Sequence, residues 1–255
     1  MRYIRPFTLI MLVCLLLAAC DMFVPLPATP TPQATPTPTP APTPTPTPAQ
    51  LSAQIGRVML GIQSFHFAIS LSGKPVYTDP SQIFEIVSLE GDLKRPDSVL
   101  ATVKITGGGS IAEVRMVSLD GKQYITNPIT RQWQCAPLGS IFDPAVLFDP
   151  AAGVEYLLQQ QFENVTLVGT ESLNGRPNLH LRGTIEGPPL MKISANSLGL
   201  GAVTADLWAD AETMRITQIG LLDPATDATN PTTWKIEFSD YDKAVDVRQP
   251  PGAQC

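Results

Sequence analysis

The 255-residue sequence predicts an α+β fold, in which a few helices gather on the apolar face of a broad antiparallel sheet. Three observations lead to this prediction. Several segments alternate polar and apolar residues, which is the period of a half-buried strand. Gly-Gly, Asp-Gly and Asn-Gly pairs separate some of these segments, and such pairs are signals of hairpin turns. Other segments carry apolar residues at the three- to four-residue spacing of a helix face.

The chain begins with a pattern that directs it out of the cytoplasm. Arg2 and Arg5 precede an uncharged apolar run, Phe7–Ala19, and this predicts a signal peptide over residues 1–19. The run is too short to span a bilayer. It ends in Leu-Ala-Ala-Cys, which resembles the lipidation motif of bacterial lipoproteins. We therefore expect Cys20 to be acylated and to anchor the chain at the extracytoplasmic face of the cell membrane. The alternative is an ordinary secreted protein in which this cysteine only follows the cleavage site.

Residues 20–49 are expected to form a tether. Of the 26 prolines, 11 fall between Pro25 and Pro48, where they alternate mostly with threonine. Proline lacks the N–H donor and fixes φ, so neither helix nor sheet is expected there. Extended polyproline II at about 3.1 Å per residue would give this stretch a reach of roughly 75 Å. A ligand for proline-binding domains and a glycosylated stalk are the alternative interpretations.

The folded domain is expected to span residues 50–255 and to open with a helix. Apolar residues between Leu51 and Ile62 recur at the spacing of one helix face, and the period changes to two between Phe65 and Leu71, as in a strand. Further strands are expected at 99–105, 111–119, 123–126, 165–173, 179–185, 203–209, 214–221 and 234–238. These strands, about nine in all, predict one large antiparallel sheet with one wet face and one covered face.

Helical segments interrupt the strands in two places. Phe142–Pro144 and Phe148–Pro150 repeat one signal, an aspartate suited to the N-cap followed by a proline suited to the first helical position. The second motif is expected to open a helix that includes Val154, Leu157, Leu158 and Phe162. The other helical segment is expected over residues 188–200.

Composition and motifs argue against an enzyme and against a nucleic-acid binder. The formal net charge is −6, whereas a nucleic-acid binder needs a basic face. The sequence has no Gly-x-Ser-x-Gly, His-Glu-x-x-His, phosphate-loop or Cys-x-x-Cys motif. His66 and His180 fall on the polar phase of their strands, which favours surface or rim positions over the role of a catalytic base. Capping explains Asp143 and Asp149 better than a catalytic carboxylate pair does. No catalytic residue, metal site or cofactor is therefore expected.

Two cysteines remain for the folded domain. Cys14 leaves with the predicted leader and Cys20 is expected to carry lipid, which leaves Cys135 and Cys255. In an oxidising extracytoplasmic compartment such a pair predicts one disulfide. Closing a loop of about 120 residues would stabilise the fold by about 4–5 kcal/mol in the chain-entropy model. The alternative is two buried or free thiols.

Several short motifs together resemble the LppX/LprAFG family of bacterial lipoproteins over roughly residues 51–251. No single motif is strong, and the resemblance rests on their order and spacing. The motifs are Ser64–Phe67, Gly91–Asp97, Phe142–Leu158, Asn164–Thr170 followed by Asn174-Gly175, Val203–Asp210, and Phe238–Asp246.

The resemblance implies a half-barrel, a strongly curved antiparallel sheet wrapped around a few helices and enclosing an apolar cavity. It also implies a carrier that holds acylated lipid or glycolipid in that cavity. For each residue expected to line the cavity, plain core packing is the alternative role. These residues are Phe65, Phe67, Ile105, Met116, Leu147, Val154, Leu157, Leu181, Leu190, Ile193 and Leu207.

Two other functions are open alternatives. The first is a chaperone that carries other lipoproteins by recognising their acylated termini. The second is a surface scaffold or interaction module with a filled core and no ligand. Neither the particular lipid nor a protein partner in an export system follows from the residues, because the long Thr-Pro tether and the Cys135–Cys255 pair depart from the better-known family members.

Overall fold

The computed structural model describes residues 45–255 except 79–80, 137–143, 195–196, 200 and 254. The predicted signal peptide, Cys20 and most of the predicted tether lie outside the described residues. Within the described part, one sheet of 12 strands has the order β7-β6-β5-β4-β3-β1-β12-β11-β10-β9-β8, with β2 added beside β3. Every pairing in it is antiparallel.

The elements follow one another along the chain in two groups of strands separated by helices. The helices are α2 (Pro48–Leu60), the 3₁₀ helix η1 (Pro144–Phe148), α3 (Val154–Tyr156), the π-helix η2 (Leu157–Gln161) and α4 (Gly187–Ile193). The strands are β1 (Ser64–Ser72), β2 (Val76–Tyr77), β3 (Glu85–Lys94), β4 (Ser98–Gly107), β5 (Ser110–Leu119), β6 (Lys122–Thr126), β7 (Trp133–Cys135), β8 (Phe162–Leu173), β9 (Arg176–Ile185), β10 (Val203–Asp210), β11 (Ile216–Asp223) and β12 (Thr232–Ser239).

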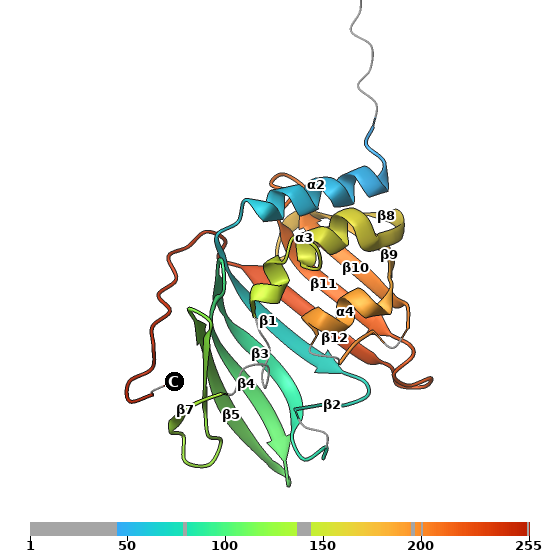
Figure 1. Ribbon diagram of the computed structural model, residues 1–255. Coiled ribbons are helices and arrows are strands. Elements are labelled where there is room, and N and C mark those ends of the chain that lie inside the picture. The colour runs from blue at the N-terminus through green and yellow to red at the C-terminus, as the bar shows by residue number, and fades with distance from the viewer. Residues whose placement is uncertain (1–44, 79–80, 137–143, 195–196, 200, 254) are drawn as a thin grey trace, which may run out of the picture. The chain divides into compact units, whose positions relative to one another are not determined.

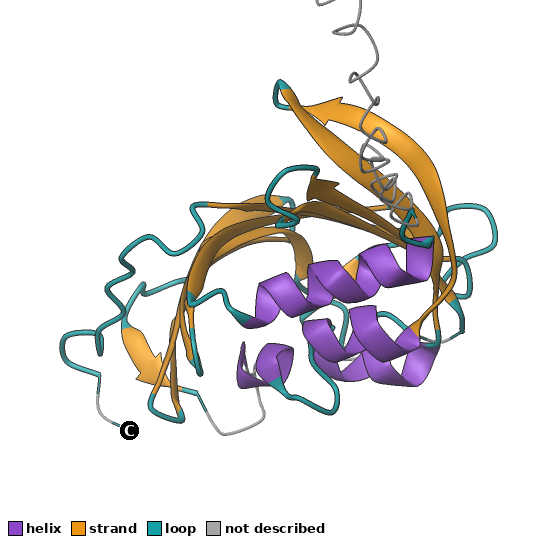
Figure 2. Cartoon of the chain, turned by 90° about the horizontal axis from the view of Figure 1, so that it is seen from above, coloured by secondary structure: helices purple, strands orange, loops and turns teal. Residues whose placement is uncertain are grey.

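The sheet is strongly curved and does not close on itself, so the fold is the predicted half-barrel. The described helices lie together on its concave side (Figures 1 and 2). Strands β7 and β8 end the described strand order at opposite edges. An α+β fold with helices on one face of an antiparallel sheet is therefore confirmed, and the curvature gives the apolar face its concave form.

Helix α2 begins where the Thr-Pro repeats end. Thr47 is its N-cap and Pro48 is its first residue. The hydroxyl of Thr47 accepts a hydrogen bond from the backbone N–H of Gln50 at 3.2 Å, and the side-chain oxygen of Gln50 accepts one from the Thr47 N–H at 2.8 Å. This reciprocal capping box satisfies two N–H groups that a helix start otherwise leaves unpaired. The last Thr-Pro repeat thus belongs to the folded part of the chain.

Every strand predicted from alternation is present, whereas β2, β3 and β7 were not expected. Alternation in β3 is interrupted because its register with β4 shifts between Ile86 and Ser88, and such a bulge puts two residues of one strand opposite one of the other. Gly91 further weakens the apolar phase of this strand. β2 and β7 have two and three residues, which is too short for a periodic signal.

The helices lie where the sequence predicted them, but they begin and end at different residues. Asp149 does not cap a helix, because α3 begins after Gly153 as N-cap. The carboxylate of Asp149 instead accepts from the Ala151 N–H at 2.8 Å, within a turn before the helix. Phe162 was expected in the helix but is the first residue of β8. The segment predicted at 188–200 is helical only to Ile193, and Phe142 and Asp143 lie outside the described residues.

Candidate functional site

The concave face of the sheet is a continuous apolar surface built by strand register. On β1, Phe65 pairs with Leu93 of β3, and Phe67 pairs with Gly91 of β3 and with Phe238 of β12. Alternate residues of each strand point to the same face, so these side chains all face the helices. A Cβ at Gly91 would lie 2.3 Å from the backbone oxygen of Leu100, so glycine allows neighbouring strand β4 to approach closely here.

The helices press onto this face and form the main core with it. Ile55 and Met59 of α2, and Leu157 of η2, are buried in one cluster with residues of most strands. Helix α2 lies close against η2 at Gly56. A Cβ at this position would come 3.0 Å from the Gln159 side chain, so glycine allows the close approach. The Ser52 hydroxyl donates a buried hydrogen bond of 2.7 Å to the Leu158 carbonyl. This bond joins α2 directly to the backbone of η2.

Arg95 fastens the helices to the sheet at the turn after β3. Its Nε donates to the Ile62 carbonyl at 2.8 Å, and one terminal nitrogen donates to the Met59 carbonyl at 3.3 Å. The guanidinium also pairs with Glu155 of α3, and only 18% and 8% of the two side chains are exposed. The same group lies 3.9 Å from the ring centroid of Phe148. One side chain therefore joins the end of α2, α3, η1 and the sheet.

A pocket of about 250 Å³ opens between the α3–η2 segment and α4. It is lined by Ala151, Ala152, Tyr156, Gln161, Pro188 and Pro189. Its volume is below the roughly 300–1,000 Å³ of typical small-molecule sites. This pocket alone is therefore smaller than a typical small-molecule site, and it lies between two helical segments on the concave side (Figure 2).

The residues predicted to line a cavity come together on the concave side, with one exception. Six of them are buried members of the main core cluster: Phe65, Met116, Leu157, Leu181, Leu190 and Leu207. Four are partly buried and pack against that cluster: Phe67, Leu147, Val154 and Ile193. Ile105 is buried but belongs to neither described cluster. A lining role for these residues stays a prediction.

Trp234 adds a polar N–H group to the concave face. From the sequence, this residue was predicted only to belong to a strand. Its Nε1 is buried and has no hydrogen-bond partner among the described residues. It pairs in register with Leu71 of β1 and Leu221 of β11. Leaving a buried donor unsatisfied costs about 1–3 kcal/mol, so the position is unfavourable for packing alone. The sequence did contain a sign of this buried N–H group, because it places a tryptophan on the apolar phase of a strand.

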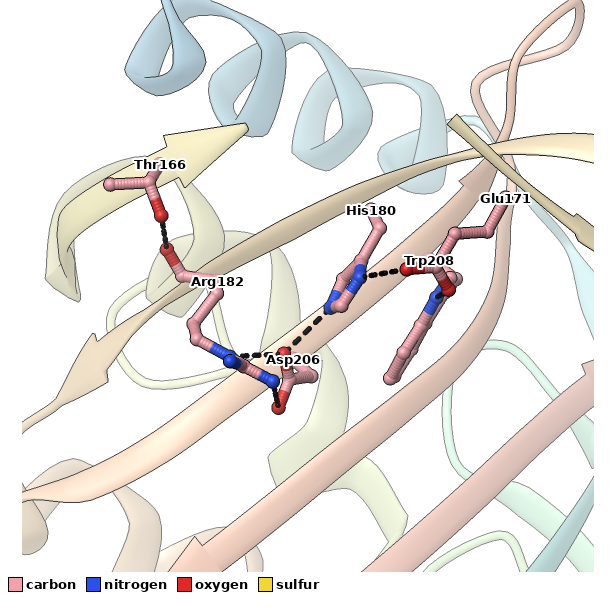
Figure 3. A network of polar contacts seen from close by, with 6 residues as sticks. All are labelled: Thr166, Glu171, His180, Arg182, Asp206 and Trp208. Atoms are coloured by element: carbon pink, nitrogen blue, oxygen red, sulfur yellow. Dashed lines mark hydrogen bonds and ion pairs between the residues drawn. The ribbon is translucent and has the colours of Figure 1, made fainter. Parts of the chain in front are cut away.

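The convex face carries a network of charged side chains around His180 (Figure 3). Nδ1 of His180 lies 2.8 Å from the Glu171 carboxylate, and Nε2 lies 2.6 Å from the Asp206 carboxylate. The imidazole stacks on Trp208 with a centroid distance of 4.2 Å. His180 is 4% exposed, so the prediction of a surface histidine was wrong. Its position on the polar phase is right, but the Trp208 ring and two carboxylates cover it.

Hydrogen bonds in this network shift the pKa values of Glu171 and Arg182. The Trp208 Nε1 donates to Glu171 at 2.8 Å. This bond, and then the bond with His180, lowers the pKa of Glu171. Asp206 accepts two hydrogen bonds from Arg182 and raises the pKa of that guanidinium. Because these four side chains contact one another, the network links β8, β9 and β10.

The disulfide joins the C-terminal tail to the sheet edge. Cys135 of β7 and Cys255 are bonded, with their Cα atoms 5.3 Å apart. Near them Ala253 packs in a second buried cluster with Val117 and Tyr124. The tail after β12 is thus held beside β5, β6 and β7, at the end of the sheet far from α4 (Figure 1).

Two further findings concern metal-binding groups and membrane-spanning helices in the described part of the chain. Among the described residues, no group of three or more His, Cys, Asp or Glu side chains has an arrangement that could hold a metal ion. None of the helices in the described ranges has the length and apolar character needed to cross a membrane. The other histidine, His66, forms a half-exposed contact of 2.9 Å with Asp92.

The family model described as LppX_LprAFG lipoprotein matches residues 47–247. Sequence relatives include the lipoarabinomannan carrier protein LprG of Mycobacterium tuberculosis, 24% identical over 194 residues, with 74% of this chain and 76% of that protein covered. LprG of Mycolicibacterium smegmatis is 25% identical over 195 residues, with the same 74% and 76% covered.

Solved structures with the same fold include LprF from Mycobacterium bovis, with a TM-score of 0.63 and 16% identity over 82% of this chain and 100% of that one. The LppX lipoprotein of Mycobacterium tuberculosis has a TM-score of 0.55 and 16% identity, over 79% of this chain and 99% of that one. At this identity the two structures establish the likeness of fold.

Proposed function

Because this chain belongs to the LppX_LprAFG lipoprotein family, we propose that it is a membrane-anchored, extracytoplasmic carrier of lipid or glycolipid. The acyl chains of the cargo would lie between the concave face of the sheet and the helices. No bond is made or broken in this function. Affinity would come from apolar surface removed from water, at about 25 cal/mol per Å².

The apolar concave face is the observation that carries this proposal. In the part of the chain that the structure describes, five short helices face a sheet of 12 strands, and the longest of these helices, α2, has 13 residues. Such short elements can be displaced without unfolding the sheet, because the strands are paired with one another and not with the helices. The eleven residues predicted to line the cavity are the proposed contact surface, with Ile105 at its margin.

The names of the relatives support a lipoglycan or a related acylated glycolipid as the class of cargo. LprG is named a lipoarabinomannan carrier. A lipoglycan combines acyl chains, which suit the concave face, with a large polar part that has to remain in water. An open half-barrel permits this division, because one end of the site is not closed by strands.

The proposal also includes a location, because the carrier would be held on the membrane through acyl chains on Cys20. Two or three acyl chains at this residue would hold the protein firmly on the membrane. The Thr-Pro tether would then hold the carrier domain away from the bilayer at a variable distance. A carrier on such a tether can take cargo from one surface and present it to another without leaving the membrane.

The carrier function is tested by measuring lipid uptake. The protein used is the chain without its predicted leader, residues 1–19, and with Cys20→Ser to remove the anchor. Ile193→Arg would replace a partly buried apolar side chain of α4, which packs against the main core cluster, with a charged one. We expect this variant to take up at least tenfold less diacyl lipid from vesicles, because a buried unpaired charge opposes acyl chains strongly. Uptake is measured with a fluorescent diacyl lipid, and extracted cargo by mass spectrometry.

Ile129→Arg is the matched control, because the Ile129 side chain is 88% exposed. This variant should take up lipid as the parent chain does, and circular dichroism should show the same strand content in all three proteins. Absence of lipid uptake by the parent chain would contradict the proposal. Uptake of acylated peptides but not of diacyl lipids would instead favour a chaperone for other lipoproteins.

A further inference from the structure

The indole of Trp234 is the one group on the concave face whose buried donor has no partner among the described residues. Its cross-strand neighbours, Leu71 and Leu221, are aliphatic. The ring packs against the main core cluster. A buried tryptophan N–H ordinarily finds a hydrogen-bond partner, and each exception in a native protein calls for an explanation.

Chemistry restricts the missing partner to a neutral oxygen acceptor. The indole N–H is a donor only, so its partner has to accept. A charged acceptor such as a phosphate would be costly to bring among aliphatic side chains. An ester carbonyl, by contrast, is neutral and is attached directly to an acyl chain. It is the acceptor that a lipid brings deepest into an apolar site.

The position of Trp234 in the strand agrees with such a contact. β12 begins at Thr232, so the indole lies near the end of the sheet. From there the apolar phase continues through Ile236 to Phe238, which packs on Phe65 with a centroid distance of 5.5 Å. An ester held at Trp234 would therefore have its acyl chain directed along this row towards the main core.

We propose that the Nε1–H of Trp234 donates a hydrogen bond to an acyl-ester carbonyl of the cargo and so positions the lipid in the carrier. This inference rests on the proposed function. It goes further in naming the ester linkage as a feature that the protein recognises. Trp234 is thus a specificity-determining residue, distinct from the aliphatic residues that contribute apolar area.

The test compares two lipids that differ only at the linkage. The probes are dipalmitoyl phosphatidylcholine, with ester carbonyls, and dihexadecyl phosphatidylcholine, with ether oxygens. We expect the chain with Cys20→Ser to bind the ester lipid about 2- to 12-fold more tightly, the range of one hydrogen bond. Trp234→Phe keeps most of the ring and removes the donor. It should therefore bind both lipids with the affinity of the parent chain for the ether lipid.

Trp208→Phe is the matched control, because it removes an indole donor from the convex face and should leave the ester preference intact. The proposal is overturned if the parent chain shows no preference, or if Trp234→Phe retains it, while both lipids still bind. Failure of both lipids to bind the parent chain would contradict the carrier function itself. A loss of stability in Trp234→Phe with unchanged selectivity would assign the indole a packing role only.

Discussion

Arg95 contacts several elements on the concave side through one guanidinium. Its guanidinium satisfies two backbone carbonyls at the end of α2 and the buried carboxylate of Glu155. Helices shorter than two turns gain little stability from their own hydrogen bonds. Their attachment to the sheet therefore depends on tertiary contacts of this kind. If the helices move away from the sheet, the Arg95–Glu155 ion pair has to break or move with them.

Arg95→Met should destabilise the fold by about 3–5 kcal/mol, because it leaves the Glu155 carboxylate buried and unpaired. Urea denaturation followed by circular dichroism measures the change. The double variant Arg95→Met with Glu155→Leu should recover most of the loss, since an apolar pair needs no charge compensation. Arg248→Met, at an exposed ion pair with Asp246, should change nothing measurable. Equal effects of the buried and exposed substitutions would contradict this role.

Glu171 gives the convex network a defined pH dependence. Hydrogen bonds from Trp208 and His180 lower its pKa in the folded state. Its stabilising effect is therefore present above the unfolded glutamate pKa, about 4.3, and is lost as the pH falls through the lower folded value.

Glu171→Gln should be less stable than the parent chain near pH 6, and the difference should shrink as the pH falls below about 4. The glutamine keeps the shape but has one acceptor oxygen in place of two, so the substitution removes the charge together with one of the contacts to Trp208 and His180. Thermal unfolding at several pH values provides the measurement. Glu113→Gln, at an exposed position of β5, serves as control. A stability difference that grows on acidification would have the wrong sign for a lowered pKa.

At the scale of the element, the disulfide holds a very short strand and a tail without secondary structure. β7 has three residues, too few to be stable at a sheet edge on its own. The bond to Cys255, 120 residues away in sequence, fixes both segments beside β6.

Cys135→Ser with Cys255→Ser should lower the free energy of unfolding by up to about 4–5 kcal/mol, from the loop closed by the bond. Hydrogen exchange should rise first in β7 and in the tail after β12, and the remaining strands should keep their protection relative to global unfolding. The parent chain under reducing conditions is the natural comparison. Uniform loss of protection over all strands would show that the bond supports the whole sheet and not this edge.

Local patterns predicted most of the sheet because its hairpins are local structures. Asp120-Gly121 and Asn174-Gly175 lie at the turns β5–β6 and β8–β9, with the positive φ values that such turns need. β3 was missed because a bulge breaks its alternation. The helix expected through Phe162 is present but ends at Gln161, because Phe162 pairs with Ile185 of β9 as the first residue of β8. Tertiary pairing here prevails over helical spacing.

The apolar residues of the candidate site could be predicted from the sequence, but the contacts between its side chains could not. Alternation placed Phe65, Leu181 and Leu207 on the covered face, and the structure brings them into one core. The polar contacts could not be predicted in this way. Arg95 and Glu155 are 60 residues apart in sequence, and they meet only because β3 and α3 lie on the same side of the fold. The unpaired donor of Trp234 depends likewise on which side chains surround it.

For the molecule as a whole, the capping box at Thr47 has a mechanical consequence. In the proposed anchored state, any pull between the membrane and a bound partner travels along the Thr-Pro repeats. The first folded residues to receive it are Thr47 and Pro48, at the start of α2. This helix covers the concave face and ends at the carbonyls held by Arg95. Tension would therefore act first on the helix above the cargo, and the tether would join the release of lipid to the force on the anchor.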